Sequence, residues 1–214
     1  MPLAVEPFDL AVATKRVTDT GDQDLVNPAF GSTTRCAIII ASEAGLDGAE
    51  VDHANISVGV VDDSGNEYCS STYSQNGVSD KNPKNRQRAT ACAMLLDSAG
   101  GDAFVATYDS MITNGIRLNT ADTGWSLGAL LLGGAAVKNV HVQSASGPSS
   151  GSTNIEDPGF EPTFVMAIAT RHTAFDDVAQ DGGGLLIGFC KNHRGVVAQN
   201  CVSWGETNNT TSNS

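Results

Sequence analysis

Apolar residues occur along this chain in short runs, and clusters of Gly, Asn, Asp and Ser separate the runs. The most apolar run, Trp125–Leu132, ends in two glycines and predicts a strand that is buried on both faces. Two more strand-like runs, Ala91–Leu96 and Ile116–Asn119, come before it. Turn residues that tolerate positive φ, such as Thr113–Gly115, lie between the runs. The stretch Arg88–Gly134 therefore predicts the core of a β-domain.

The chain on either side of this block has the same character. Arg35–Ser42, which contains consecutive β-branched residues, Asn55–Asp62 and Glu67–Tyr73 each predict a strand. Ser74–Arg88 is polar and predicts a long loop, whereas the alternation in Val137–Gln143 predicts a half-exposed strand. No stretch places apolar residues at helical spacing over three turns. The pattern predicts an all-β fold, an antiparallel β-sandwich of the jelly-roll type.

A second, shorter series of the same signals follows a segment rich in Gly, Ser and Pro. Each signal resembles one about 130 residues earlier, and a repeat at this spacing is more specific than any single residue. The pairs are Asp157–Phe160 with Asn27–Phe30, Phe164–Ala169 with Arg35–Ile40, Gly184–Cys190 with Asn55–Val61, and Cys201–Ser203 with Cys69–Ser71. The second series has no counterpart of Arg88–Gly134, so we expect an incomplete second repeat.

These signals divide the chain into four segments. They are an N-terminal arm or first strand (1–26), a complete β-sandwich repeat (27–143), a linker (144–156) and a partial second repeat (157–214). In the first segment, Leu10–Val17 predicts a strand, unless the segment is an arm that docks on a neighbour, and Asp19–Asp24 predicts a turn. The partial repeat completes its sheet by packing on the first copy or by adding strands to a neighbouring subunit, unless the chain continues beyond Ser214.

Composition narrows the class of partner. The formal net charge is −12 and Lys and Arg total only 12, which argues against a phosphate backbone as partner. The one basic cluster, Lys81–Arg88, predicts a solvated loop or a contact with an acidic neighbour. The chain has no apolar run of about 18 residues and its N-terminus does not resemble a secretory signal. We therefore expect neither a nucleic-acid partner nor a membrane partner.

The five cysteines do not form a recognisable disulfide framework or zinc site, because their number is odd and no C-x-x-C occurs. Cys36 and Cys92 lie in apolar runs and predict small buried side chains. Cys190 and Cys201 could face each other across a hairpin, which leaves a disulfide between them open. Three N-x-S/T sequons, at Asn55, Asn208 and Asn209, matter only in a secreted chain.

We find no constellation that predicts catalysis. The four histidines, His53, His141, His172 and His193, lie in no recognisable motif, and no G-x-S-x-G is present. Adjacent carboxylates such as Asp176 and Asp177 point to opposite faces of a strand and make a poor acid pair. Asp62–Asn66 lacks the ligand spacing of a calcium loop and predicts a hairpin turn. We therefore predict a protein that is not an enzyme and has no catalytic, cofactor or metal residues.

Aromatic residues make up only 6% of the chain, and three of them carry a prediction. Trp125 opens the most apolar run and predicts core packing. Trp204 precedes the polar tail, and Tyr73 ends a predicted strand. These two side chains are our candidates for contact with a ligand or partner.

The ordered motifs of the chain resemble a family of repeated β-domains encoded largely in tailed-phage and prophage genomes. The family repeats a G-F-x-P motif followed by an apolar strand, then A-C-x-x-L-D, D-G-F-x-L-N and L-A-L-G-G motifs. The matching segments are Gly159–Pro162 with a degraded copy at Ala29–Gly31, Ala91–Asp97, Asn114–Asn119 and Leu130–Gly134, in order over about residues 27–205. The chain departs from the family at Ile116, where the motif has Phe, and in its incomplete second repeat.

The resemblance implies a structural protein of a tailed-phage virion, made in the host cytoplasm. Its role would be a capsid decoration, a head fibre or a tail-associated subunit, with other virion proteins and copies of itself as partners. The family carries no catalytic residues that could be transferred. Two alternatives stay open: a carbohydrate-binding module of a tail fibre or secreted protein, and a subunit of an extracellular filament or surface layer.

Overall fold

The computed structural model describes residues 7–45, 53–75, 83–146, 158–170, 174–193 and 196–206, which form fourteen β-strands and no helix. The strands are β1 (Asp9–Arg16), β2 (Gly21–Val26), β3 (Thr34–Ser42), β4 (His53–Asp62), β5 (Glu67–Gln75), β6 (Lys84–Arg88), β7 (Ala93–Leu96), β8 (Asp102–Ile112), β9 (Gly115–Thr120), β10 (Ser126–Gly133), β11 (Phe164–Ala169), β12 (Gln180–Asp181), β13 (Gly183–His193) and β14 (Val196–Glu206). The predicted all-β class is confirmed.

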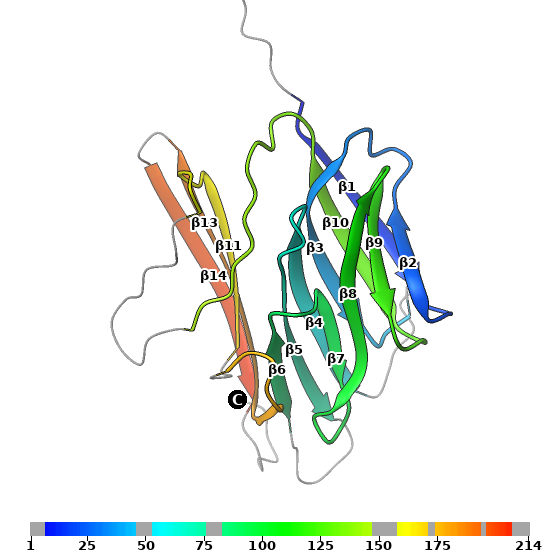
Figure 1. Cartoon of the computed structure of the whole chain (residues 1–214). Helices are drawn as coiled ribbons and strands as arrows, with labels where there is room; N and C mark the ends of the chain where they lie inside the picture. The colour runs from blue at the N-terminus through cyan, green and yellow to red at the C-terminus, as the bar shows by residue number, and fades with distance from the viewer. Residues whose placement is uncertain are drawn as a thin grey trace, which may run out of the picture.

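The strands form three antiparallel sheets (Figure 1). The large sheet has seven strands in the order β1-β10-β3-β4-β5-β6-β12, and the small sheet has four in the order β2-β9-β8-β7. The C-terminal sheet has the order β11-β13-β14. The large and small sheets pack face to face, so the predicted antiparallel sandwich is also confirmed.

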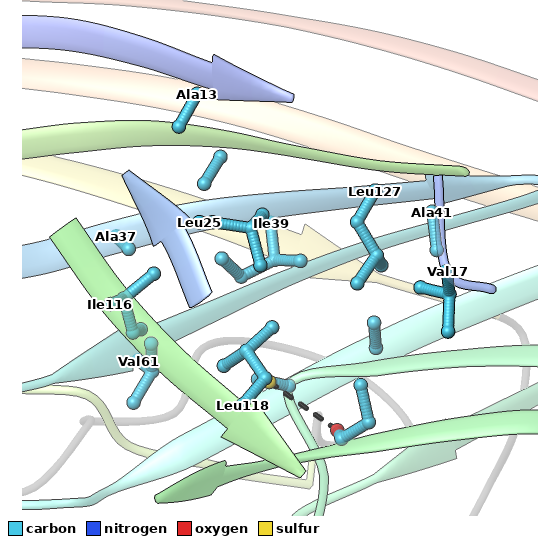
Figure 2. Packing of buried hydrophobic residues seen from close by; sticks show 14 of the residues in the cluster. Ala13, Val17, Leu25, Ala37, Ile39, Ala41, Val61, Ile116, Leu118 and Leu127 are labelled. Carbon is cyan, nitrogen blue, oxygen red and sulfur yellow. Dashed lines mark hydrogen bonds between the residues drawn. The ribbon is translucent and has the colours of Figure 1, made fainter. Parts of the chain in front are cut away.

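The core lies between the large and small sheets and is built by the period of two in each strand. On β10, Leu127, Ala129 and Leu131 point inward and are at most 1% exposed. They meet Ile39 of β3 and, from the small sheet, Leu118 of β9. Figure 2 shows side chains of β3 and β10 facing those of β2 and β9. The outward-facing alternate residues of β10 are only half-buried, so this strand is not buried on both faces as its apolar run predicted.

The predicted hairpin turn at Asp62–Asn66 is confirmed, since β4 ends at Asp62 and β5 begins at Glu67. The Asp62 Oδ1 atom accepts the backbone N–H groups of Ser64 and Asn66, both at 3.0 Å. Gly65 has a φ of 85°, which a residue with a Cβ rarely adopts. The carboxylate therefore binds turn amides rather than an ion.

Two strands contradict or extend the sequence analysis. The predicted loop Ser74–Arg88 is wrong at both ends, because β5 extends to Gln75 and β6 pairs with β5, and residues 76–82 lie outside the described residues. Two arginines of β6 pair with Asp102. The charged side chains made this segment resemble a solvated loop, although its backbone pairs within the large sheet. Strand β8 was not predicted: Phe104 and Ala106 point inward, whereas the alternate residues Ala103, Val105 and Thr107 are only partly buried.

Three further predictions need correction or choice. The predicted strand Val137–Gln143 is wrong: the segment is coil, because its backbone bonds to side chains of the large sheet. The Lys138 carbonyl accepts a hydrogen bond from Arg35, and the Val142 N–H donates to Asp62.

The turn predicted at Asp19–Asp24 is shorter, because β2 begins at Gly21. Of the two alternatives for residues 1–26, the described part forms strands: β1 pairs with β10 along its whole length, and β2 pairs with β9. Most of the predicted linker, residues 147–156, lies outside the described residues.

The C-terminal sheet repeats the strand order of part of the large sheet. Strands β11, β13 and β14 follow one another as β3, β4 and β5 do. The pairing register also agrees at one point: Gly59 lies opposite Cys69, and Gly188 lies opposite Cys201. These are the residues that the sequence repeat aligned.

The C-terminal sheet is anchored at the edge of the large sheet. Strand β12 pairs with β6, and Lys84 forms an ion pair with Asp181. The Gln87 side chain donates a hydrogen bond to the Ala174 carbonyl at 3.2 Å, and Leu185, near the start of β13, is 2% exposed. The partial repeat therefore packs on the first copy, one of the two arrangements that the sequence left open.

Candidate functional site

An apolar patch covers part of the outer face of the large sheet. Strand register places Val12, Leu130, Ile38 and Val60 side by side in one row across β1, β10, β3 and β4. We call this surface the outer patch, and it consists of Leu10, Val12, Ile38, Ile40, Val60, Leu130 and Leu132. Within it, Leu10, Val12 and Ile40 are 56%, 59% and 47% exposed. A contiguous apolar patch of this kind is typical of a contact surface.

A second apolar surface lies on one face of the C-terminal sheet. Trp204 and Val202 of β14 lie opposite Leu185 and Ile187 of β13, so their side chains share a face. The same face carries Phe164 and Phe189, whose ring centroids are 5.9 Å apart. Phe164 is 56% exposed and Trp204 is 43% exposed. Trp204, which the sequence analysis named as a candidate contact, is therefore available to a partner.

Tyr73, the other named candidate, is 4% exposed and lies in the main sandwich rather than near Trp204. It lines a pocket of about 300 Å³ at the end of the sandwich where β4 begins and β5 and β7 end. Its ring meets the His53 ring edge-on, with centroids 5.7 Å apart. Glu43 and Asp97 also line the pocket, and burial, followed by these two carboxylates, raises the pKa of the Tyr73 hydroxyl.

Two other residues that line this pocket, Asn55 and Trp125, also stabilise the sandwich. Asn55 holds β4 to the end of β7: its amide nitrogen donates to the Leu96 carbonyl at 2.7 Å, and its oxygen accepts the Leu96 N–H. Because this amide nitrogen is engaged and Asn55 is 5% exposed, the folded chain does not present the Asn55 sequon for glycosylation. The other two sequons lie outside the described residues. Trp125 packs on Phe104 of the core as predicted and also lines the pocket.

A second, shallow pocket of about 550 Å³ lies beside the β4–β5 turn and contains Glu67 and His141. The Glu67 carboxylate accepts the Tyr108 backbone N–H at 2.8 Å, and burial raises the pKa of this carboxyl group. In the ranges the structure describes, no group of three or more His, Cys, Asp or Glu residues could hold a metal ion. His172 lies outside these ranges, and His193 is at the end of β13 opposite Val196.

The cysteines are free thiols in the described chain. Cys201 lies opposite Gly188 and Cys190 lies opposite Gln199, so the two cysteines of the hairpin are offset from each other. Cys92 is buried as predicted, while Cys36 is half-buried. Burial raises the pKa of the Cys36 thiol to about 12 and that of Cys92 well above its usual value, so neither forms a nucleophilic thiolate at neutral pH.

The described part of the basic cluster, Lys84, Arg86 and Arg88, is paired within the chain, and Lys81 lies outside the described residues. Arg86 and Arg88 each contact the Asp102 carboxylate at 2.6 Å, and Lys84 contacts Asp181. The acidic neighbours that the sequence analysis considered for this cluster are therefore residues of the same chain. These contacts fix β6 against β8 and β12.

Comparisons with protein-family models, with curated proteins and with solved structures find no match to this chain. Within the described ranges, no helix is long and apolar enough to cross a membrane. Function therefore has to be argued from the surfaces and pockets of the chain itself.

Proposed function

We propose that this chain is a structural protein of a tailed-phage virion, a capsid decoration, head-fibre or tail-associated subunit that acts through contacts between subunits. The observation that carries the proposal is the outer patch, in which Leu10, Val12 and Ile40 remain about half exposed on a sheet face. An isolated soluble sandwich usually places polar residues on such a face. The family resemblance of the ordered motifs supports the same role.

The physical mechanism is burial of apolar area at many equivalent contacts. Burying a Val, Leu or Ile side chain completely contributes about 1.5–3 kcal/mol, and association must also offset the lost freedom of two bodies. Three half-exposed side chains therefore support only a weak pairwise contact. In a symmetric particle, many such contacts act together, and the effective concentration of neighbouring sites increases the total affinity. The acidic surface disfavours binding to the packaged nucleic acid.

A charge placed in the outer patch tests the proposal. We expect the purified chain to associate with itself or with particles that lack it, and Val12→Asp to weaken that binding at least tenfold, about 1.4 kcal/mol. The reason is that Val12 is 59% exposed, so the aspartate is solvated in the free chain and loses solvent only in the contact. Sedimentation equilibrium and particle binding measure the effect.

The matched control is Thr123→Asp, which adds the same charge at an exposed turn away from the outer patch. It should bind like the unmodified chain, and both variants should keep the same unfolding midpoint. A purified chain that stays monomeric and does not bind particles lacking it contradicts the proposal. Equal binding by Val12→Asp and Thr123→Asp would show that the outer patch is not the contact surface.

A carbohydrate-binding module is the second candidate, and the Tyr73 pocket favours it. An aromatic ring next to carboxylates, here the half-buried Trp125 beside Glu43 and Asp97, is suited to stacking on a sugar ring while the carboxylates accept hydrogen bonds from its hydroxyl groups. If this function is correct, the chain binds on a glycan array and Glu43→Gln reduces that binding at least fivefold. Loss with Trp204→Ala instead would place the glycan on the C-terminal sheet, and no glycan binding by the unmodified chain rejects this candidate.

A further inference from the structure

The large sheet and the C-terminal sheet each contain a glycine opposite a cysteine at equivalent positions, but the two pairs differ in what covers them. Gly59 of β4 lies opposite Cys69 of β5, and Gly188 of β13 lies opposite Cys201 of β14. Both glycines are in the interior of a strand, where glycine weakens the sheet and often marks a close approach of another backbone. Neither has a positive φ, so turn geometry does not explain them.

In the first unit, the small sheet explains the glycine. A Cβ atom on Gly59 would lie 1.9 Å from the Cys92 carbonyl oxygen and 2.8 Å from the Cβ of Cys69. The chain at the start of β7 therefore lies directly on β4, and only a residue without a side chain leaves room for it. Cys69 is 0% exposed under the same cover.

In the second unit, no described residue requires the glycine. A Cβ atom on Gly188 would meet Cys201 at 3.5 Å, Asn200 at 3.7 Å and Leu186 at 3.8 Å, which are ordinary contacts within its own sheet. Gly188 itself is buried among these neighbours, but Cys201 beside it is exposed. The position that receives a foreign backbone in the first unit is thus uncovered in the second, as far as the described chain shows.

The surroundings of Gly188 form a face of small, apolar and uncharged polar side chains. We call it the glycine face, and strand register assigns to it Val165, Ala167, Ala169, Leu186, Gly188, Cys190, Val197, Gln199, Cys201 and Ser203. Val165 is 38% exposed and Val197 is 61% exposed. Its counterpart in the first unit is the core-facing side of β3, β4 and β5, where Ala37, Ile39 and Ala41 are 0% exposed. The inner face of the first unit also carries small polar residues, Ser57 and Ser71, so the two faces are similar in composition.

We propose that the glycine face binds the second sheet of a β-sandwich: an antiparallel sheet built like β9-β8-β7 and contributed by a partner protein. A strand of that sheet places a backbone carbonyl on Gly188, as the Cys92 carbonyl lies on Gly59. Small side chains flank this carbonyl, as Ala91 and Ala93 flank Cys92. The proposal rests on the structural role proposed above, because it adds a second contact surface and the kind of partner it fits.

The test supplies such a sheet and reads out Cys201. Residues 83–134, which contain β7, β8 and β9 of such a sheet with the flanking strands β6 and β10, are fused as a second copy after Ser214 through a flexible Gly/Ser linker. Maleimide labelling of Cys201 is followed by peptide mass spectrometry. We expect labelling of Cys201 in the extended chain to be at least tenfold slower than in the original chain, because the added sheet covers the thiol.

Gly188→Leu is the control for specificity. In the extended chain it should restore fast labelling, because the leucine occupies the place of the incoming carbonyl. In the original chain it should leave the unfolding midpoint and the labelling rate nearly unchanged. Labelling that is equally fast in both chains, or slow in the extended Gly188→Leu variant, overturns the proposal.

The original chain alone distinguishes a different occupant. If labelling of Cys201 slows as the concentration of the original chain rises, a second copy covers the glycine face and the proposed partner is wrong. These results are independent of the particle-binding test, because Val12→Asp alters the outer patch and leaves the glycine face unchanged. Failure of the labelling test can therefore be distinguished from failure of the particle-binding test.

Discussion

Gly59→Ala is expected to destabilise the sandwich by more than about 3 kcal/mol and to leave much of the chain unfolded at 37 °C. The new methyl group would lie 1.9 Å from the Cys92 carbonyl oxygen and 2.8 Å from Cys69 Cβ. Extra atoms in a packed core usually cost about 1–3 kcal/mol, and more where the opposing atoms belong to backbone that cannot move aside. Relief of the clash requires β7 to separate from β4, which also disrupts the Asn55 hydrogen bonds to Leu96. Urea unfolding monitored by tryptophan fluorescence measures the loss.

The matched control for this prediction is Gly188→Ala, which changes the same residue type opposite the same partner type in the other repeat. Its methyl group meets nothing closer than 3.5 Å, so we expect the free energy of unfolding to change by no more than about 1 kcal/mol. Alanine also restricts the unfolded chain more than glycine does, which favours a gain in stability. Equal urea midpoints for Gly59→Ala and the unmodified chain would contradict the close packing of β7 on β4. A large loss for Gly188→Ala would show that the two repeats are packed alike.

The strands that sequence predicted correctly are those whose apolar runs also face the core. The runs at β3, β4 and β10 place Ile39, Val61 and Leu131 inward, and the burial of these residues stabilises the pairing that the pattern predicts. Strand β6 was missed because Arg86 and Arg88 suggested a solvated loop, and only the folded chain brings Asp102 close enough to pair with them. Such a long-range ion pair leaves no local signal.

Errors in the opposite direction have a similar origin. Val137–Gln143 alternates like a strand, but its Val142 N–H donates to Asp62, a residue 80 positions away. A segment whose backbone groups bond to side chains has no free ladder to offer a neighbouring strand. Alternation alone does not show whether an adjacent strand is present.

The candidate surfaces were only partly predictable. Trp204 was named for its place before the polar tail and is exposed, whereas Tyr73 was named for its place at a strand end and is buried. The outer patch was missed because the run that contains Ile38–Ile40 was read only as a strand, and Trp125–Leu132 was read as a strand buried on both faces. The useful signal was present in the isoleucine run: residues of both parities are apolar, so one face had to remain open unless a second sheet covered it. Among the described residues, the C-terminal sheet contacts the large sheet mainly at β5 and β6.

Leu131→Asp is expected to unfold the chain at neutral pH. Leu131 is 0% exposed on β10, where it pairs with Ala11 and Ala37 and faces the core. Loss of a buried leucine costs about 2–5 kcal/mol, and burial of a carboxylate without a partner adds a further cost. The sum is comparable with the whole stability of a typical domain, about 5–15 kcal/mol. Circular dichroism and urea unfolding at pH 7 should show a chain that is largely unfolded or has lost at least about 5 kcal/mol.

The pH dependence of this variant separates the charge from the cavity. Burial raises the pKa of the new carboxyl group above its unfolded value of about 3.9, so the folded state binds more protons than the unfolded state in the window above that value. The stability of the variant, compared with that of the unmodified chain at the same pH, should therefore be highest below about pH 4. It should fall as pH rises through the raised pKa of the new carboxyl group. Leu132→Asp, on the half-buried outer side of the same strand, is the control and should stay folded with a much smaller loss. If Leu131→Asp and Leu132→Asp unfold at the same urea concentration at pH 7, the assignment of the two faces of β10, and with it the position of the outer patch, is wrong.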